Sequence, residues 1–383
     1  MGIEIRELVD ADAGVRRAFL EVAAQIYAGD PCWVRPLDMD IVDRFNRRKN
    51  PFFQHGEATA WVAWQGGRPV GRVSASVDHE HLRLHRDGAG FFGFFDTIDD
   101  AEVAGALLER AQSWLAARDL ERMRGPLSLC INEESGCLVD GFDSSPMFMM
   151  PHHLPYQAGL IEGAGLRKLK DLYAWKYEIG RVPPRAERGH DEIARLPEVS
   201  ARPIRKKTLE EDMRVVMDIF NDAWSDNWGF VPMTEQEVVK TAQDVKLIAI
   251  EDITRLVFID GEPAAVALGL PNLNECIQDL NGSLFPFGFV KLLWRLRVRG
   301  PKSGRLILLG IRKKYRQIRR YAGLSAYLYV ALNRSSQLLG MTRAELSWTL
   351  EDNAAVNVGI KMMGGSIYKT YRIFEKAIGA KAP

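Results

Sequence analysis

Several side chains in this chain are of the types that take up or release a proton in group-transfer chemistry. His152 and His153 are adjacent, and neutral imidazoles are natural bases near pH 7. Glu133 stands beside a second carboxylate in a loop, and Asp226 lies in a Trp-rich turn, where either acid could hold an ammonium or accept its proton. Each of these side chains also has a structural interpretation. The histidines could be a hydrogen-bonding pair, Glu133 could belong to a solvated acid pair, and Asp226 could be a helix cap.

A long basic stretch is the strongest indication of a bound ligand. Residues 280–344 contain fourteen Lys and Arg and no Asp or Glu, although the whole chain has a net charge of only +1. Within it, a strand-like run at 305–311 leads into a cationic loop at 312–320 and then to Gly323, which opens a helix. This order predicts a phosphate site, because backbone N–H groups and the positive helix end would face the anion. The alternative is a solvated basic loop beside an ordinary glycine.

The composition excludes several classes of protein. The chain has 383 residues, 46% hydrophobic and 26% charged, which indicates a soluble protein of two domains. It contains no run of about 18 apolar residues and no apolar leader, so we expect neither a membrane span nor a signal peptide. Four scattered Cys indicate a cytoplasmic protein, and the spacing of His79, His81 and His85 fits no zinc pattern, so we expect no metal. One cationic patch on a nearly neutral protein suits a small polyanion, and we expect no nucleic acid partner.

The order of elements predicts an α/β protein with a mixed sheet and helices on both faces. Apolar periodicity and turn residues give the order strand, helix, hairpin, strand, turn, helix, strand, helix, strand, and this order occurs twice. We predict one domain at 1–180, a linker at 181–200 that contains a Pro-Pro pair, and a second domain at 201–383. The turn after the fourth strand is basic in the second domain but acidic in the first, at 96–100.

Three motifs in the second half carry a resemblance to a known family. They are the Arg-x-x-Gly-x-Ser motif that begins at Arg320, the Glu-x-Asn sequence that ends at Asn353, and the glycine pair at 364–365. They resemble the phosphate loop and last helix of the GNAT superfamily of N-acyltransferases, which implies acyl-CoA as co-substrate and a site role for Asn353. The residues that the resemblance assigns to the cofactor are Leu309, Gly310, Ile311, Arg319, Arg320, Ala322, Gly323, Leu324 and Ser325. It also implies tandem GNAT-like folds with a degenerate first copy, whose acidic turn would repel a pyrophosphate.

Longer strings in both halves are similar to a narrower family. They are Phe91-Phe-Gly-Phe-Phe-Asp-Thr97, His153-Leu-Pro-Tyr-Gln157 with Leu160-Ile-Glu-Gly163, and Leu284-Phe-Pro-Phe-Gly-Phe-Val-Lys-Leu-Leu293. These strings resemble two-domain GNAT proteins that include the bacterial ceramide synthases, which implies transfer of an acyl group to a long-chain amine, a sphingoid base. One departure concerns catalysis, because the Tyr that many GNAT enzymes carry as an acid in the last helix is replaced by Ile360.

The segment from Ser283 to Arg299 has the pattern of a basic amphipathic helix. Its cations Lys291, Arg295 and Arg299 would share one face. The opposite face would carry apolar side chains, namely Phe289, Leu292, Leu293 and Leu296. Such a helix could lie on an anionic membrane, here the inner face of the cytoplasmic membrane, or wall a tunnel for an acyl chain. It could also be an ordinary surface helix that packs on the core.

Three functions remain open at this point. The first is an acyl-CoA-dependent N-acyltransferase acting on a long-chain amine, and the second is a GNAT acetyltransferase acting on a small polar amine or a protein amine. The third is a basic-faced module, not an enzyme, that binds phosphate, nucleic acid or membrane. The Phe-rich strands and the amphipathic segment favour the first function. The acyl length, the amine, the general base and the oligomeric state stay undetermined.

Overall fold

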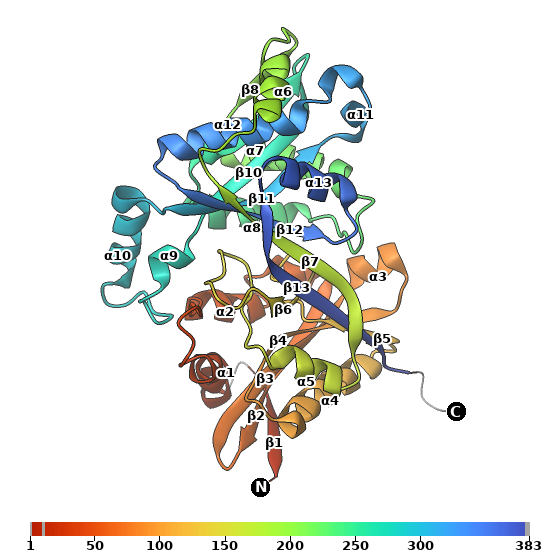
Figure 1. Ribbon diagram of the computed structural model, residues 1–383. Helices are drawn as coiled ribbons and strands as arrows, with labels where there is room; N and C mark the ends of the chain where they lie inside the picture. Colours follow the sequence, from red (N-terminus) through yellow and green to blue (C-terminus); the bar gives the residue numbers. More distant parts are fainter. Residues whose placement is uncertain (1, 10–11, 380–383) are drawn as a thin grey trace. The chain divides into compact units, whose positions relative to one another are not determined.

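The computed structural model describes residues 2–9 and 12–379, and the chain divides into two compact units (Figure 1). Unit 1 contains Met1–Leu172, Ile277–Leu284 and Lys369–Pro383. Unit 2 contains Tyr173–Cys276 and Phe285–Tyr368. Both units combine helices with a mixed sheet, which confirms the predicted fold class.

Unit 1 holds a sheet in which β4 and β5 are parallel and the other neighbours are antiparallel. Its strands are β1 (Ile3–Glu7), β2 (Gly56–Gln65), β3 (Arg68–Asp78), β4 (Ala89–Thr97), β5 (Arg122–Gly125) and β6 (Cys137–Asp140), with β1 to β5 in that order. Its helices are α1 (Ala13–Ile26), α2 (Asp38–Phe45), α3 (His79–His85), α4 (Ala101–Ala116) and α5 (Gln157–Gly163). The last strand of the chain, β13 (Ser366–Ala377), enters unit 1 at Lys369 and pairs with β5 and β6.

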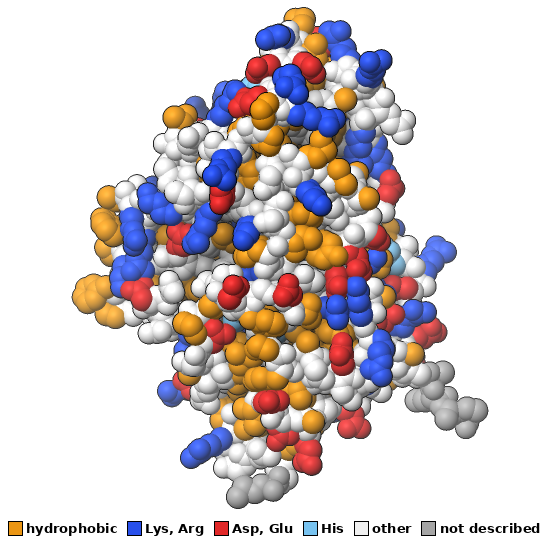
Figure 2. Space-filling model, viewed as in Figure 1, with side chains coloured by type: hydrophobic (Ala, Val, Ile, Leu, Met, Phe, Trp, Pro, Cys, Tyr) orange, Lys and Arg blue, Asp and Glu red, His pale blue; other side chains and the backbone are white. Residues whose placement is uncertain are grey.

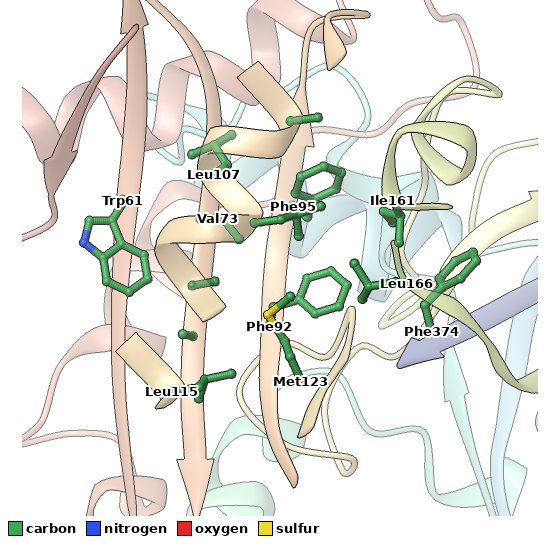
Figure 3. Close-up of a cluster of buried hydrophobic side chains, with 14 of the residues drawn as sticks. Trp61, Val73, Phe92, Phe95, Leu107, Leu115, Met123, Ile161, Leu166 and Phe374 are labelled. Carbon is green, nitrogen blue, oxygen red and sulfur yellow. The ribbon is translucent and has the colours of Figure 1, made fainter. Parts of the chain in front are cut away.

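Helices α4 and α1 cover opposite faces of the unit 1 sheet. The buried side chains of α4 recur at spacings of three and four residues, which aligns them on one side of the helix. They are Val103, Ala104, Leu107, Leu108, Ala111 and Leu115. They pack against Phe92 and other buried apolar side chains of the strands (Figure 3). On the other face, Val15 and Phe19 of α1 pack against Val62 of β2, so the sheet has an apolar layer on both sides.

Unit 2 holds a sheet in the order β12-β11-β10-β9-β8, in which β11 and β12 are parallel and the other neighbours are antiparallel. The strands are β8 (Val199–Arg202), β9 (Thr254–Ile259), β10 (Glu262–Pro271), β11 (Ser303–Ile311) and β12 (Arg343–Leu350), and β7 (Arg167–Glu178) passes from unit 1 into unit 2. The helices are α6 (Pro184–Ala194), α7 (Leu209–Trp224), α8 (Glu235–Lys246), α9 (Asn274–Ile277), α10 (Gly288–Trp294), α11 (Lys313–Arg316), α12 (Leu324–Leu338) and α13 (Ala354–Met362).

The segment 181–200, which the sequence assigns to a linker, contains helix α6. This helix begins directly after Pro183, and a proline suits the first turn of a helix because its missing N–H would have no partner there. Ile193 of α6 is buried, and the helix packs against α12. The Pro-Pro pair therefore marks the start of a packed helix.

The segment from Ser283 to Arg299 is helical only from Gly288, and its faces differ from the predicted ones. Phe289 and Leu292 were both expected on the apolar face, but Phe289 is 48% exposed, whereas Leu292 is buried. Arg295, expected on the cationic face, donates to the carbonyl oxygen of Cys276 at 2.7 Å. A wide π-helical turn at Arg295–Arg299 follows α10, and it rotates the later residues away from their regular helical positions.

Candidate active site

Strands β11 and β12 form the centre of the candidate site in unit 2. Their parallel register ends at the pair Leu306–Leu346, while β11 continues to Ile311 and β12 to Leu350. We call this point of separation the fork. Beside it, β11 carries one extra residue, Ile307, relative to its antiparallel neighbour β10. Bulges of this kind bend a strand and are common next to active sites, so the fork combines the end of strand pairing with a local bend in β11.

The residues predicted to hold the cofactor follow one another from the fork to the start of α12. Leu309, Gly310 and Ile311 form the end of β11, and α11 and a short 3-10 turn at Arg319–Tyr321 then lead to Gly323, the N-cap of α12. Among the described residues, no side chain caps this helix. Its first backbone N–H groups, together with the positive helix end, are therefore available to an anion.

Packing against α6 explains why position 323 holds glycine. The φ angle of Gly323 is −82°, which any residue can adopt. A Cβ atom at this position would lie 2.7 Å from the carbonyl oxygen of Gly189 in α6. A side chain at 323 would thus displace α6 as well as alter the anion site. Ser325, in the first turn of α12 and partly exposed, is the cleaner position for testing the site.

The basic loop before α12 is held in place by acidic side chains. Arg320 pairs with Glu198, and the ammonium of Lys313 lies 2.6 Å from Oδ2 of Asp226. The hydrogen bond from Lys313 lowers the pKa of Asp226, whose side chain is 80% exposed. The structure therefore places Asp226 against the predicted cofactor loop, whereas Arg319 of the same loop is exposed.

The corresponding fork of unit 1 is filled by its own chain. Parallel pairing of β4 with β5 ends at Phe91–Arg124, and the residues after β5 then run along β4. The N–H of Leu127 donates to the carbonyl oxygen of Phe92 at 2.7 Å, and a Cβ on Gly93 would overlap the carbonyl oxygen of Leu127. The segment after β5 thus occupies the fork of unit 1.

The start of α4 in unit 1 is occupied as well. Asp100 caps this helix, because its side chain accepts hydrogen bonds from the backbone N–H groups of Glu102 and Val103 at 2.8 and 3.2 Å. Asp96, also in the predicted acidic turn, is buried and bonded to Arg72. An internal carboxylate therefore sits where an incoming phosphate would have to bind.

His152 is one half of a buried imidazole–carboxylate pair in unit 1. Its Nε2 lies 2.7 Å from Oδ2 of Asp30, which fixes the proton on Nε2. Burial lowers the pKa of His152 and the Asp30 carboxylate opposes this, so the ring is neutral near pH 7. Among the described residues, its buried Nδ1 has no hydrogen-bond partner, and this nitrogen can accept a proton.

His153 and Glu133, also in unit 1, are already engaged. Nδ1 of His153 accepts the backbone N–H of Leu138 at 3.1 Å, and burial lowers the pKa of His153 to about 4. Glu133 Oε2 lies 3.5 Å from the guanidinium of Arg44. These contacts give both side chains a role in holding the structure.

Asn353, in unit 2, caps α13 by accepting the N–H of Val356 at 3.4 Å. Ile360, at the position of the usual GNAT Tyr, is buried among apolar side chains of unit 2. The predicted catalytic residues are therefore divided between the units: His152, His153 and Glu133 belong to unit 1, and Asp226 and Asn353 belong to unit 2.

Sequence reasoning missed a buried polar cluster at the fork. Glu345 of β12 is fully buried and lies in register with Arg305 of β11, whose Nε is 3.5 Å from Oε1 of Glu345. Arg305 also donates to Oγ of Ser347 at 2.7 Å, and the hydroxyls of Ser347 and Tyr368 both donate to Glu345. One signal was available, because Glu345 is the first acidic residue after the acid-free stretch 280–344.

One group of possible metal ligands occurs among the described residues, and it lies on α6. Glu187, His190 and Asp191 have ligand atoms within 4.8 Å of one another. Glu187 is paired with Arg334, and Nδ1 of His190 lies 3.0 Å from Asp191. With these partners, the three side chains form an ion-paired surface of α6, so no metal is needed to explain why they lie together.

Comparisons with known proteins agree with this architecture. No protein-family model matches the chain. The bacterial ceramide synthase of Caulobacter vibrioides is 40% identical over 367 residues, which cover 94% of each protein. Protein YghO of Escherichia coli is 38% identical over 364 residues, covering 94% of this chain and 93% of that protein. A tandem GNAT protein from the clavulanic acid pathway, solved without AcCoA, has a TM-score of 0.60 at 13% identity, with all of both chains covered.

Proposed function

Because this chain belongs to the bacterial ceramide synthase family of two-domain GNAT N-acyltransferases, we propose that it joins the acyl group of a long-chain acyl-CoA to the amine of a sphingoid base. The contrast between the two forks supports this most strongly. In unit 2 the strands separate and lead to an uncapped helix start beside basic residues. In unit 1 the same two places are filled by Leu127 and Asp100, so each chain would bind one acyl-CoA.

The acyl-CoA would lie along β11 of unit 2. Its pyrophosphate would accept hydrogen bonds from the backbone N–H groups of Leu324 and Ser325, with Arg319 nearby. Its pantetheine arm would run past Ile311 toward the fork. The thioester would then arrive next to the bulge at Ile307. Acyl transfer builds negative charge on the carbonyl oxygen, and a backbone N–H re-aimed by the bulge would stabilise that charge.

Product analysis tests this proposal and separates it from the alternative amines. The protein is incubated with acyl-CoAs of several chain lengths, together with either a sphingoid base or a small polar amine, and amides and free CoA are measured by mass spectrometry. We expect a long-chain amide of the sphingoid base and an equal amount of free CoA. Acetylation of the small amine with no long-chain amide would assign the protein the second function instead.

Unit 2 also carries an exposed apolar surface that suits a lipid interface. We call it the aromatic patch, and it is gathered around α10 at the left of the view (Figure 2). Its side chains are Phe285, Phe287, Phe289, Val290, Trp294 and Val298. Phe287 is 77% exposed, and the exposed cations Lys291, Arg297 and Arg299 lie within the same segment. In the described part of the chain, no helix is both long and apolar enough to cross a bilayer.

We propose that the aromatic patch rests on an anionic bilayer, where long-chain amines and acyl groups are found. Aromatic side chains favour the interface between headgroups and acyl chains, and the cations add attraction to anionic lipids. Large exposed apolar patches on soluble proteins mark binding surfaces of this kind. The patch would thus bring the enzyme to its lipid substrates without a spanning segment.

Replacing Phe287 and Trp294 together by Ser is expected to weaken binding to phosphatidylglycerol vesicles at least about tenfold, because two aromatic anchors are lost. Vesicle sedimentation measures the effect. The matched control is Leu338→Ser on α12, which removes another highly exposed apolar side chain, 89% exposed, outside the patch. Equal vesicle binding by both variants and the wild type would remove the membrane proposal but leave the acyltransferase proposal intact.

A further inference from the structure

The buried carboxylate of Glu345 lies where the reacting end of the acyl-CoA would arrive. It belongs to the residue pair directly before Leu306–Leu346, so it marks the closed end of the fork. The proposed pyrophosphate site, at the start of α12, lies at the opposite end, after Ile311. A substrate that spans these two points would bring its thioester to the cluster around Glu345.

Stability alone does not explain a charge at this position. Taking a carboxylate out of water is costly even when a cation pairs with it, and well-packed apolar residues often serve a core equally well. Here the carboxylate has three polar neighbours, Arg305, Ser347 and Tyr368. Arg305 and Ser347 are buried, but Tyr368 is partly exposed. Of these three neighbours, Tyr368 alone is partly exposed and also bonds to Glu345 through its hydroxyl.

We propose that Tyr368 and Glu345 form the proton relay of acyl transfer, an inference that rests on the proposed function. As the amine nitrogen forms its bond to the carbonyl carbon, it gives one proton to the Tyr368 oxygen, and the proton of Tyr368 passes to Glu345. The C–S bond then breaks with its electron pair on sulfur. The thiolate takes a proton back through Tyr368, and Glu345 gives up the proton that it had received.

This relay supplies what the last helix lacks. The GNAT position for a tyrosine acid holds Ile360, whose side chain is apolar and buried. One shuttle that first accepts the proton of the nitrogen and then returns it to sulfur needs no separate acid. Arg305 lies beside the Glu345 carboxylate and orients it, which makes Arg305 a positioning residue rather than a proton carrier.

Two variants test the relay, Tyr368→Phe and Glu345→Gln. We expect each to lower kcat about 100-fold or more, the range typical of general acid–base groups. The KM for acyl-CoA and CoA binding measured by calorimetry should stay at the wild-type values. Tyr368→Phe is the decisive variant because it removes one oxygen from a partly exposed side chain. The matched control, Tyr177→Phe, also loses buried hydrogen bonds in unit 2, to Arg181 and Asn333, and should keep the wild-type kcat.

The pH profile separates a relay from a structural role. Raising the pH should restore part of the lost rate in both variants, because hydroxide can replace an internal base. A deficit that is the same at every pH, or a raised KM for acyl-CoA, would assign the cluster a structural role and overturn the relay. Full activity of both variants would overturn the relay and leave the proposed function standing. A wild type that forms no amide would overturn both.

Discussion

The Ser325→Asp variant is expected to bind acyl-CoA at least about tenfold more weakly than the wild type, at an unchanged or slightly higher Tm. Two like charges about 4 Å apart near a protein surface repel by several kcal/mol, and about 1.4 kcal/mol is already a factor of ten. The same carboxylate in the first turn of α12 interacts favourably with the helix dipole, by about 0.3–1 kcal/mol. The affinity for acyl-CoA should therefore fall, while the stability of the fold stays unchanged or rises slightly.

Unit 2 contains a closely matched control position for this variant. Gln236 occupies the same position in α8 that Ser325 occupies in α12, the second residue of the helix. Gln236→Asp adds the same charge at the same helical position and should leave the Kd for CoA unchanged. Calorimetric titration with CoA and with a long-chain acyl-CoA measures both variants. Wild-type affinity of Ser325→Asp for both ligands would exclude the start of α12 as the pyrophosphate site.

The elements of the proposed anion site were open to prediction from sequence because they are local. A strand, a basic turn and a helix start follow one another within 305–325, so no distant pairing is needed to bring them together. The acidic turn of the first half is equally local. In the structure its Asp100 is the N-cap of α4, so the start of this helix is capped by a side chain of the chain itself. Order and charge along a short segment were sufficient to predict these local elements in both places, whereas binding of an anion stays a prediction.

The features that distinguish the two forks are not local. The end of the β11–β12 register and the extra residue Ile307 both depend on the pairing of three strands, β10, β11 and β12. These strands come together from distant positions in the sequence. The role of Gly323 depends on α6, which packs against it from a segment that resembles a linker in composition. The burial of a side chain also depends on distant contacts. The His-His sequence alone does not indicate that His153 accepts a hydrogen bond from the backbone N–H of Leu138.

Gly93→Ala is expected to destabilise unit 1 by about 3 kcal/mol or more, because the added Cβ would overlap the carbonyl oxygen of Leu127. The cost should be high because the obstacle is backbone, and the N–H of Leu127 is itself bonded to Phe92. Chemical denaturation measures the loss. The control Gly105→Ala, in the middle of α4 with open space around its Cβ, should instead stabilise by up to about 1 kcal/mol.

The comparison of these two glycines tests how unit 1 differs from unit 2. If the chain after β5 fills the fork, Gly93 can accept no side chain, and an acyl-CoA arm could not enter there either. The variant should still bind CoA below its unfolding temperature, since Leu324 and Ser325 lie in unit 2. Equal stability of Gly93→Ala and the wild type would mean that the segment at Leu127 can move aside. Unit 1 would then have to be considered as a second acyl-CoA site, and the one-site proposal would fail.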